Sequence, residues 1–325
     1  MARHIEGLPR KAADISTFER AADAIVDGDL EILDKLLRDE PSLVRARSTR
    51  EHRATLLHYV SANGVEDFRQ RTPANIVAIA RHLLDAGAEV NAECDVYGGG
   101  AMTLGLVATS AHPRAAKVQE ALVDLLLERG ARLDARAVHG CLMNGCPEAA
   151  AHLALRGAPV GFIEAAGLGR LDLLAERFEP QRTATEAELG SAMMMAAWYD
   201  RMDVIGFLLD RGVDVSVRDP KEGQTALHIA AYQGSAALVE FLIARGAVLD
   251  IKDAVYGTTP VVWALHGWLV DRRTPDDGYR RVLLQLAHEG ASVQNEWIDD
   301  ERIRADGELH AALAARVTRG PNEPS

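Results

Sequence analysis

Three histidines occupy one position of a recurring pattern, and histidine is the side chain that most often binds metals or transfers protons near neutral pH. His58, His139 and His228 each lie six residues before a glycine, at positions 64, 145 and 234. They could form a zinc site only if their ring nitrogens met about 2 Å from one ion. Because the three histidines belong to non-adjacent units of the pattern, we expect a structural role for them and no metal site.

The cysteines offer little more chemistry. Cys141 and Cys146 follow His139 in the segment HGCLMNGC, but their C-x4-C spacing differs from the C-x2-C of most zinc sites, and no second pair follows. On a helix His139 points away from Cys141, so it is not placed to activate a thiol. With Cys94 the cysteines number three, which gives no even disulfide framework and is typical of a reducing compartment.

Motifs for cofactors are also missing from the sequence. The glycine-rich stretch YGGGAM (97–102) lacks the G-K-[ST] of a phosphate-binding loop and does not match G-x-G-x-x-G. We interpret it as a hairpin tip that requires positive φ angles. Glu164, in the apolar stretch FIEAAG, could be a buried acid with a raised pKa, but we expect it on a solvated face. The sequence therefore predicts no cofactor.

Charge and hydropathy limit the classes of partner. The 325 residues include 36 basic and 48 acidic ones, for a net charge of −12. Such a balance opposes nonspecific binding to nucleic acid or anionic membranes and permits a basic protein or a cationic small molecule. The longest apolar run, PVVWALHGWLV, is too short to cross a bilayer, and the first residues contain no apolar core of a signal peptide. We expect a cytoplasmic protein.

A repeat organises the chain. The stretches AAWYDRMDVIGFLLDRGVDVSVRD (196–219) and AAYQGSAALVEFLIARGAVLDIKD (230–253) align with an offset of 34 residues throughout. Residues 83–95 and 125–137 repeat the second half of this pattern. A period of about 33 residues that contains two helices and a turn is typical of a stacked solenoid.

The stretch GQTALHIAAYQGSAALVEFLIARGAVLDIKD (223–253) resembles an ankyrin repeat, with Ala226 where proline is usual. Weaker copies are TLLHYVSANG (55–64), HGCLMNG (139–145) and GTTPVVWALHGW (257–268). VYGGG and LVATSAHP add a similarity to uncharacterised bacterial ankyrin proteins. The resemblance implies an all-α solenoid of helix-turn-helix units with short β-hairpin connections, and a concave binding surface whose partner it does not name.

The repeat has local physical causes. Thr225 is placed to cap an inner helix, and Gly212 and Gly246 follow outer helices where a left-handed conformation favours glycine. Ala230 and Ala231 are small, which allows neighbouring helices to approach closely.

We expect an N-terminal arm over 1–18, a single solenoid of about eight repeats over 19–312 with a polar joint near 179–191, and a disordered tail over 313–325. The predicted inner helices are 19–27, 55–63, 101–110, 137–144, 161–168, 190–199, 225–233 and 259–268.

Repeats 2, 3 and 8 carry insertions between their helices. The insertions are EDFRQRTPAN (66–75), SAHPRAAK (110–117) and VDRRTPDDG (270–278). Thr72–Pro73 and Thr274–Pro275 are predicted to begin delayed outer helices, with threonine as the cap and proline in the first turn.

Aromatic residues gather in three successive repeats. By the resemblance, the two residues after each Ala-Ala pair face the concave side. Inner helices lie about 10 Å apart, so Trp198, Tyr232 and His266 should form a row over roughly 20 Å. Trp263 aligns with Ile229 and is expected to be packing. The predicted binding residues are Trp198, Tyr199, Tyr232, Gln233, Tyr256, His266 and Trp268.

Two functions fit this row. The first is a non-enzymatic interaction module that grips a protein or peptide, which the net charge suggests is basic. Hairpin residues would give specificity: Arg218, Lys221, Glu222 and Tyr256. A second patch is predicted at Asp95, Tyr97 and His112.

The alternative is a stack adapted as a small-molecule binder or an enzyme. The three insertions would wall a pocket in which Tyr199, Tyr232 and His266 hold an apolar or cationic ligand, with His266 as acid or base. A closed pocket of a few hundred Å³ would favour this function, and an open trough would favour the first.

Overall fold

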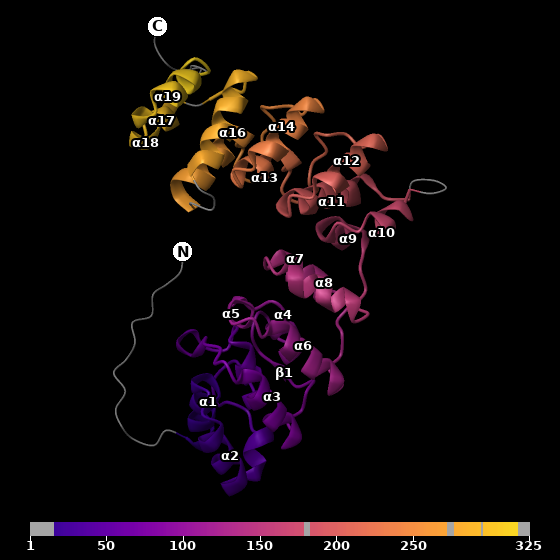
Figure 1. Ribbon diagram of the computed structural model, residues 1–325, viewed down its shortest axis with the longest axis vertical. Coiled ribbons are helices and arrows are strands. Elements are labelled where there is room, and N and C mark those ends of the chain that lie inside the picture. Colours follow the sequence, from indigo (N-terminus) through magenta and orange to yellow (C-terminus); the bar gives the residue numbers. More distant parts are fainter. Residues whose placement is uncertain (1–15, 179–182, 272–275, 294, 318–325) are drawn as a thin grey trace. The chain divides into compact units, whose positions relative to one another are not determined.

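The computed structural model describes residues 16–178, 183–271, 276–293 and 295–317 (Figure 1). The chain divides into two compact units, unit 1 over residues 1–159 and unit 2 over residues 160–325. Each unit is built from short helices that pack in pairs. None of the helices within the described ranges is long and apolar enough to cross a membrane.

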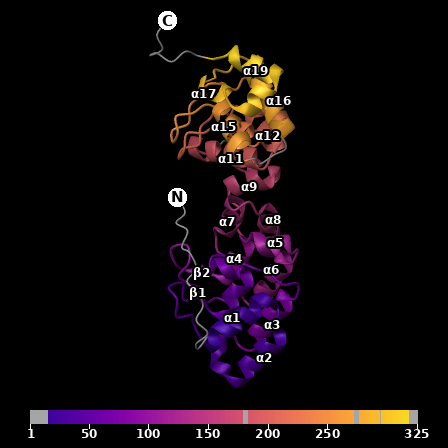
Figure 2. The same cartoon turned by 90° about the vertical axis from the view of Figure 1, so that its left-hand side faces the viewer.

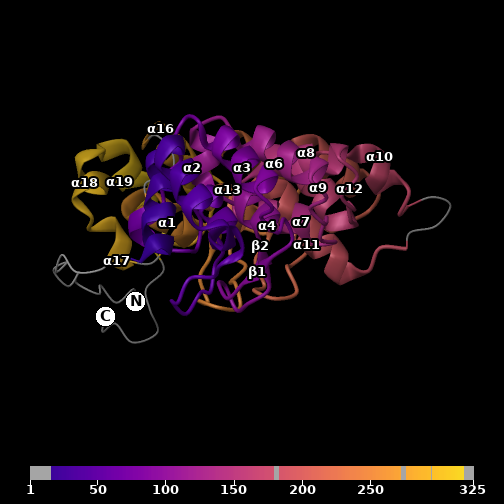
Figure 3. The same ribbon diagram turned by 90° about the horizontal axis from the view of Figure 1, so that it is seen from below.

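Unit 1 is helical apart from a small two-stranded sheet. α1 packs against α2 and η2, η2 packs against α3 and α4, and α7 packs against α8 (Figure 2). The antiparallel strands β1 and β2 pair Glu93 with Met102 and Cys94 with Ala101, and β2 lies beside α4 (Figure 3). The elements are α1 (Thr17–Asp27), α2 (Leu30–Asp39), η1 (Pro41–Arg45), η2 (Leu56–Ser61), η3 (Asp67–Arg69), α3 (Ile76–Asp85), β1 (Glu93–Cys94), β2 (Ala101–Met102), α4 (Thr103–Ala108), α5 (Ala111–Ala115), α6 (Gln119–Glu128), α7 (Ala137–Met143) and α8 (Pro147–Leu155).

Unit 2 repeats one arrangement along its length. The inner helices α9, α11, α13 and α15 pack each against the next, while α12 and α14 pack on the outer side of α11 and α13. The elements are α9 (Phe162–Leu168), α10 (Leu171–Ala175), α11 (Glu186–Trp198), α12 (Met202–Asp210), α13 (Ala226–Tyr232), α14 (Ala236–Ala244), α15 (Pro260–His266), the π-helix η4 (Gly267–Asp271), α16 (Asp276–His288), α17 (Asn295–Ile298), α18 (Glu301–Ala305) and α19 (Gly307–Ala314).

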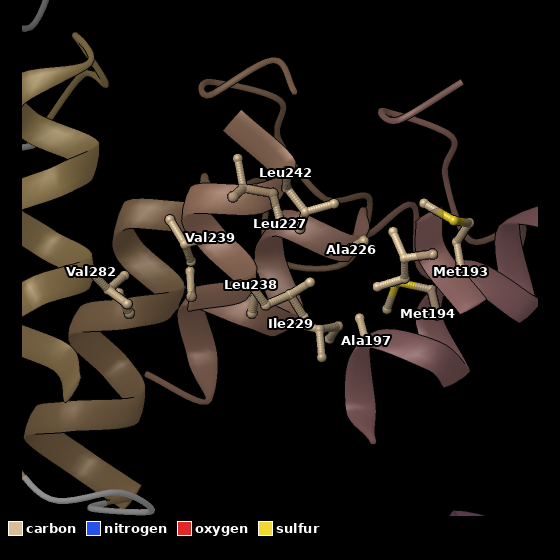
Figure 4. Close-up of a cluster of buried hydrophobic side chains, with 14 of the residues drawn as sticks. Met193, Met194, Ala197, Ala226, Leu227, Ile229, Leu238, Val239, Leu242 and Val282 are labelled. Carbon is tan, nitrogen blue, oxygen red and sulfur yellow. The ribbon is translucent and has the colours of Figure 1, made fainter. Parts of the chain in front are cut away.

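Apolar side chains from successive helix pairs form one core in unit 2. Met193 of α11, Leu227 of α13, Leu242 of α14 and Val282 of α16 are all fully buried (Figure 4). Ala197 and Ala230 are fully buried as well, as expected where inner helices approach closely. The core therefore fixes the spacing of the inner helices and of the residues at their ends.

The predicted inner helices each overlap a helix of the structure, although the second, η2, is a 3-10 helix. Gly212 and Gly246 follow α12 and α14 with φ angles of 82° and 87°, which confirms their place at helix ends. The number of repeats, and the continuity of one solenoid across residue 159, stay predictions.

Three predicted boundaries were wrong. α1 begins at Thr17, inside the predicted arm, because Ser16 caps it. α11 begins at Glu186, inside the predicted polar joint, because Thr185 and Glu188 form a reciprocal capping box. In the predicted tail, α19 continues to Ala314, since Leu313 is fully buried in the core; residues 318–325 lie outside the described residues.

The prediction for Thr72–Pro73 was also wrong, since α3 begins at Ile76. The segment before α3 is held against the turn after α1: Asn75 Nδ2 donates to the carbonyl oxygen of Gly28 at 2.8 Å. A Cβ atom on Gly28 would lie 2.9 Å from the Cβ of Pro73, so the two segments are in close contact. Thr274–Pro275 lies outside the described residues.

Candidate interaction surface

Three inner helices of unit 2 end in aromatic rings that contact one another. Trp198, Tyr232 and His266 are the last residues of α11, α13 and α15. The ring centroids of Trp198 and Tyr232 are 5.8 Å apart in a T-shaped arrangement, and those of Tyr232 and His266 are 6.4 Å apart and stacked. The repeat spacing thus produces the predicted row, because helices that pack side by side bring equivalent positions together.

Trp263 packs against the hydrophobic core, as predicted, and its ring also joins this row, which the prediction did not include. Its ring lies 5.5 Å from that of Tyr232 and 6.4 Å from that of Tyr256, between centroids. Its Nε1 donates to Thr258 Oγ1 at 3.0 Å and to Asp253 Oδ2 at 3.2 Å. We call Trp198, Tyr232, Tyr256, Trp263 and His266 the aromatic surface. In the sequence, these contacts of Trp263 were indicated only by its indole N–H, a hydrogen-bond donor on a helix next to a hairpin.

A carboxylate completes the surface through an unusual turn. The π-helix η4 continues α15 and ends at Asp271, whose Oδ2 accepts a hydrogen bond from the hydroxyl of Tyr232 and lies 3.8 Å from Nε2 of His266. π-turns within helices are frequent at functional sites. Nothing in the sequence indicated Asp271, because an α-helix would have directed it elsewhere.

Gly267 permits this turn. A Cβ atom there would lie 2.2 Å from the carbonyl oxygen of Tyr232 and 2.8 Å from the hydroxyl of Tyr279. The same Tyr279 hydroxyl donates to the Tyr232 carbonyl at 2.8 Å. The start of η4 is therefore packed directly on the end of α13.

Asp253 holds the hairpin that carries Tyr256. The residue is 3% exposed, and its Oδ1 accepts from the backbone N–H groups of Val255 at 2.9 Å and Tyr256 at 2.6 Å. Its Oδ2 accepts from the N–H and the hydroxyl of Thr258, at 3.0 and 2.7 Å. Burial raises the pKa of Asp253, but these hydrogen bonds outweigh it and hold the pKa far below its usual range.

The other predicted binding residues differ in position. Gln233 is half-buried and its Nε2 donates to the carbonyl oxygen of Trp198 at 3.0 Å, which ties α13 to α11. Tyr199, also half-buried, follows the last residue of α11. Trp268 does not lie on the surface: it is 6% exposed and belongs to the core, because the π-turn directs it inward, and the guanidinium of Arg302 lies 5.8 Å from its ring.

The predicted second patch lies in unit 1. Tyr97 is 75% exposed, its hydroxyl donates to Asn63 Oδ1 at 2.8 Å, and its ring covers Gly64 so closely that a Cβ there would lie 2.5 Å away. Asp95 is exposed, and its backbone N–H donates to the carbonyl oxygen of His52 at 2.7 Å. His112 is exposed on α5.

Two of the three recurring histidines have the structural role that the pattern predicted. His58 and His228 are fully buried, and the Nδ1 of each accepts from the backbone N–H of Thr55 or Thr225 at 3.1 Å. Their Nε2 atoms lie 3.0 and 3.2 Å from the carbonyl oxygens of Ala92 and Thr258. Burial lowers the pKa of both rings, that of His58 to about 4.

His139 differs from the other two histidines. It is half-buried on α7, where Arg136 stands at the capping position instead of threonine. The capping box of His58 and His228 therefore has no threonine equivalent here.

The cysteines are buried. Burial raises the pKa of Cys141 to about 12 and also raises the pKa values of Cys94 and Cys146. Thiols of this kind are poor nucleophiles at neutral pH. Glu164 is half-buried on α9. Among the described residues, no group of three or more His, Cys, Asp or Glu side chains could hold a metal ion.

A buried arginine organises the insertion of unit 1. The side chain of Arg69 is 2% exposed, and its guanidinium lies 2.7 Å from Glu19 Oε2, 2.7 Å from Glu66 Oε2 and 2.8 Å from Asp23 Oδ1. The hydroxyl of Tyr59 also donates to Glu66 Oε1, at 3.2 Å. This polar network fixes the insertion against α1.

Comparison with known proteins identifies one family that matches part of the chain. The family model for ankyrin repeats matches residues 171–294 with three copies. No curated protein matches the chain. One matching solved structure is the crystal structure of the human ASB11 ankyrin repeat domain, which is 23% identical, with 82% of this chain and 96% of that chain covered. Its TM-score of 0.39 supports no conclusion about the fold. The family match and the paired helices of unit 2 confirm the predicted helical repeat fold, and residues 171–294 consist of ankyrin repeats.

Proposed function

We propose that this chain is a protein-interaction module whose aromatic surface binds a partner protein or peptide. Ankyrin repeats are generally protein–protein interaction modules. The observation that carries the proposal is the ring cluster on three consecutive helix ends, in which Trp198 and Tyr232 are only half-buried and Tyr256 is 72% exposed. Tryptophan and tyrosine dominate binding hot spots because they offer large contact areas with little side-chain entropy to lose.

Charge suggests the nature of the partner. Unit 2 contains 26 acidic and 17 basic residues, so most of the net negative charge of the chain belongs to the unit that carries the aromatic surface. An acidic protein surface attracts a basic partner and speeds its association. A basic protein or peptide is therefore the partner we expect, in the cytoplasm, where the free cysteines would stay reduced. Tyr97, with Asp95 and His112, would be a second, separate contact.

The first test compares three forms of the full chain as bait in a pull-down: the wild type, Trp198→Ala/Tyr232→Ala, and Met143→Ala/Leu155→Ala. The last is a matched control, because Met143 and Leu155 are 65% and 83% exposed in unit 1. We expect a protein that the wild type and the control retain and that the aromatic variant loses. The affinity for that protein, once purified, should fall by about 30-fold or more in the aromatic variant.

Circular dichroism must show that the aromatic variant is folded, and the milder Trp198→Leu variant replaces it if it is not. A partner that all three baits retain equally would refute the proposal.

The alternative function has one supporting observation, the contact of Asp271 with both Tyr232 and His266. A carboxylate beside an imidazole can orient it for proton transfer. Aromatic and quaternary-ammonium fragments can be screened by ligand-detected NMR against the wild type and His266→Ala. A fragment that binds the wild type alone would favour a small-molecule site, and the absence of such fragments would count against it.

A further inference from the structure

Two consecutive hairpin tips of unit 2 share one geometry. Residues 219–224 form the first tip and residues 253–258 the second, 34 positions later. Asp219 Oδ2 accepts from the N–H groups of Lys221 and Glu222 at 3.0 and 2.8 Å, as Asp253 Oδ1 does from the two equivalent residues. Gly223 and Gly257 both have positive φ angles, of 69° and 64°. The tips are therefore matched in backbone conformation.

The chemistry of the two tips is different. The first tip carries Lys221 and Glu222, as expected for a solvated turn, whereas the second carries Val255 and Tyr256 at the equivalent positions. Val255 is 54% exposed and Tyr256 is 72% exposed. An exposed cluster of apolar side chains, unlike a single exposed one, is a feature of interaction surfaces. Val255 and Tyr256 are adjacent, and the ring of Tyr256 contacts that of Trp263. Because the turn itself accepts charged residues, its backbone does not require the apolar pair.

The second tip is also held in one conformation before any partner binds. The carboxylate of Asp253 accepts from the backbone on both sides of Tyr256 and from the indole of Trp263. Trp263 in turn contacts the ring of Tyr256. A rigid anchor loses little conformational entropy on binding, so its buried area converts more fully into affinity.

We propose that Val255 and Tyr256 are the anchor of the interaction, and that the partner is a folded protein with an apolar pocket that receives them. This inference rests on the proposed function and names the kind of partner. Two apolar side chains that project from a turn need a concave apolar surface, which an extended peptide does not offer. Unit 2 has more acidic than basic residues, which opposes a nucleic acid or an anionic membrane as the partner of Val255 and Tyr256.

The probe is the full chain with the photoreactive residue p-benzoylphenylalanine at position 256, compared with the same residue at position 222. We expect a single protein adduct from position 256, with the linked peptide mapped by mass spectrometry to an apolar pocket of a folded domain. Position 222 should give at most a weak adduct. The absence of an adduct from position 256, equal adducts from both positions, or linkage to an unstructured peptide would each overturn the proposal.

The second experiment measures the affinity of the purified cross-linked protein by calorimetry. Val255→Lys/Tyr256→Glu gives the second tip the residues of the first, whose geometry shows that the turn accepts them. We expect the affinity to fall by about 30-fold or more, and Lys221→Ala/Glu222→Ala, the matched control, to change it by less than about threefold.

Trp198→Ala/Tyr232→Ala separates this inference from the proposed function. If that variant loses binding while the tip variant keeps it, the aromatic surface binds without this anchor and the inference fails alone. If neither variant weakens binding, the proposed function fails as well.

Discussion

Acidification should destabilise unit 1 through His58. The ring is fully buried, its Nδ1 accepts the N–H of Thr55 at 3.1 Å, and its Nε2 donates to the carbonyl oxygen of Ala92 at 3.0 Å. A second proton would have to enter at Nδ1, where it would face another donor. Burial is the largest cause that lowers the pKa of His58, from 6.5 in an exposed chain to about 4.

The sign and size of the effect follow from these two pKa values. Between pH 6.5 and pH 4 the unfolded chain binds the proton and the folded chain does not, so protons favour unfolding. The contribution of His58 is fully present above pH 6.5, and it is lost as the pH falls toward 4. The complete loss is about 3 kcal/mol, of which about 2 kcal/mol occurs between pH 7.5 and pH 5.

Urea unfolding at pH 7.5 and pH 5 measures this loss. The wild type should lose about 2 kcal/mol more of its free energy of unfolding than His58→Gln over that interval, because all other titrating groups are common to both. His112→Gln, a change at an exposed histidine, should behave as the wild type. Equal pH dependence in the wild type and His58→Gln would refute the reasoning.

NMR of the wild-type ring gives a second reading that needs no variant. The resonances of His58 should not move between pH 7.5 and pH 5.5, because the ring stays neutral there. A titration midpoint near 6.5 would show that burial does not control this histidine.

Three further predictions concern the other buried contacts. Asp253→Ala should cost about 3 kcal/mol in urea unfolding and speed hydrogen exchange of the tip amides, because several backbone and side-chain donors lose the charged acceptor that they share. Unchanged exchange would show that the carboxylate does not hold the tip. Gly190→Ala should cost about 2 kcal/mol, since its Cβ would lie 2.1 Å from a backbone oxygen of the next hairpin. Gly206→Ala should be neutral or stabilising, because the nearest atom to its Cβ would lie 3.6 Å away. Equal melting temperatures of the two variants would contradict this packing. Arg69→Ala should cost about 3–5 kcal/mol, because it leaves a buried carboxylate unpaired. Arg71→Ala, at an exposed ion pair, should cost less than about 1 kcal/mol. Similar losses in both variants would mean that burial of the network is unimportant.

Much of the fold could be predicted because its causes are local. Thr225 and His228 are three residues apart and form their capping box within one turn. Gly212 ends α12 because of its own φ angle. One local motif was missed. Thr185 and Glu188 also form a capping box, but their segment is polar and was therefore interpreted as a joint between repeats.

The sequence by itself determined the period of unit 2, and with it the row of Trp198, Tyr232 and His266, because equivalent positions of stacked helices must lie side by side. Only the tertiary structure decided how the chain continues after the last of these residues. The close packing of Gly267 on the end of α13 accompanies a π-turn, which buries Trp268 and brings Asp271 to Tyr232. Such a turn depends on contacts between residues that are distant in the sequence. A repeat pattern predicts only the contacts that all repeats have in common.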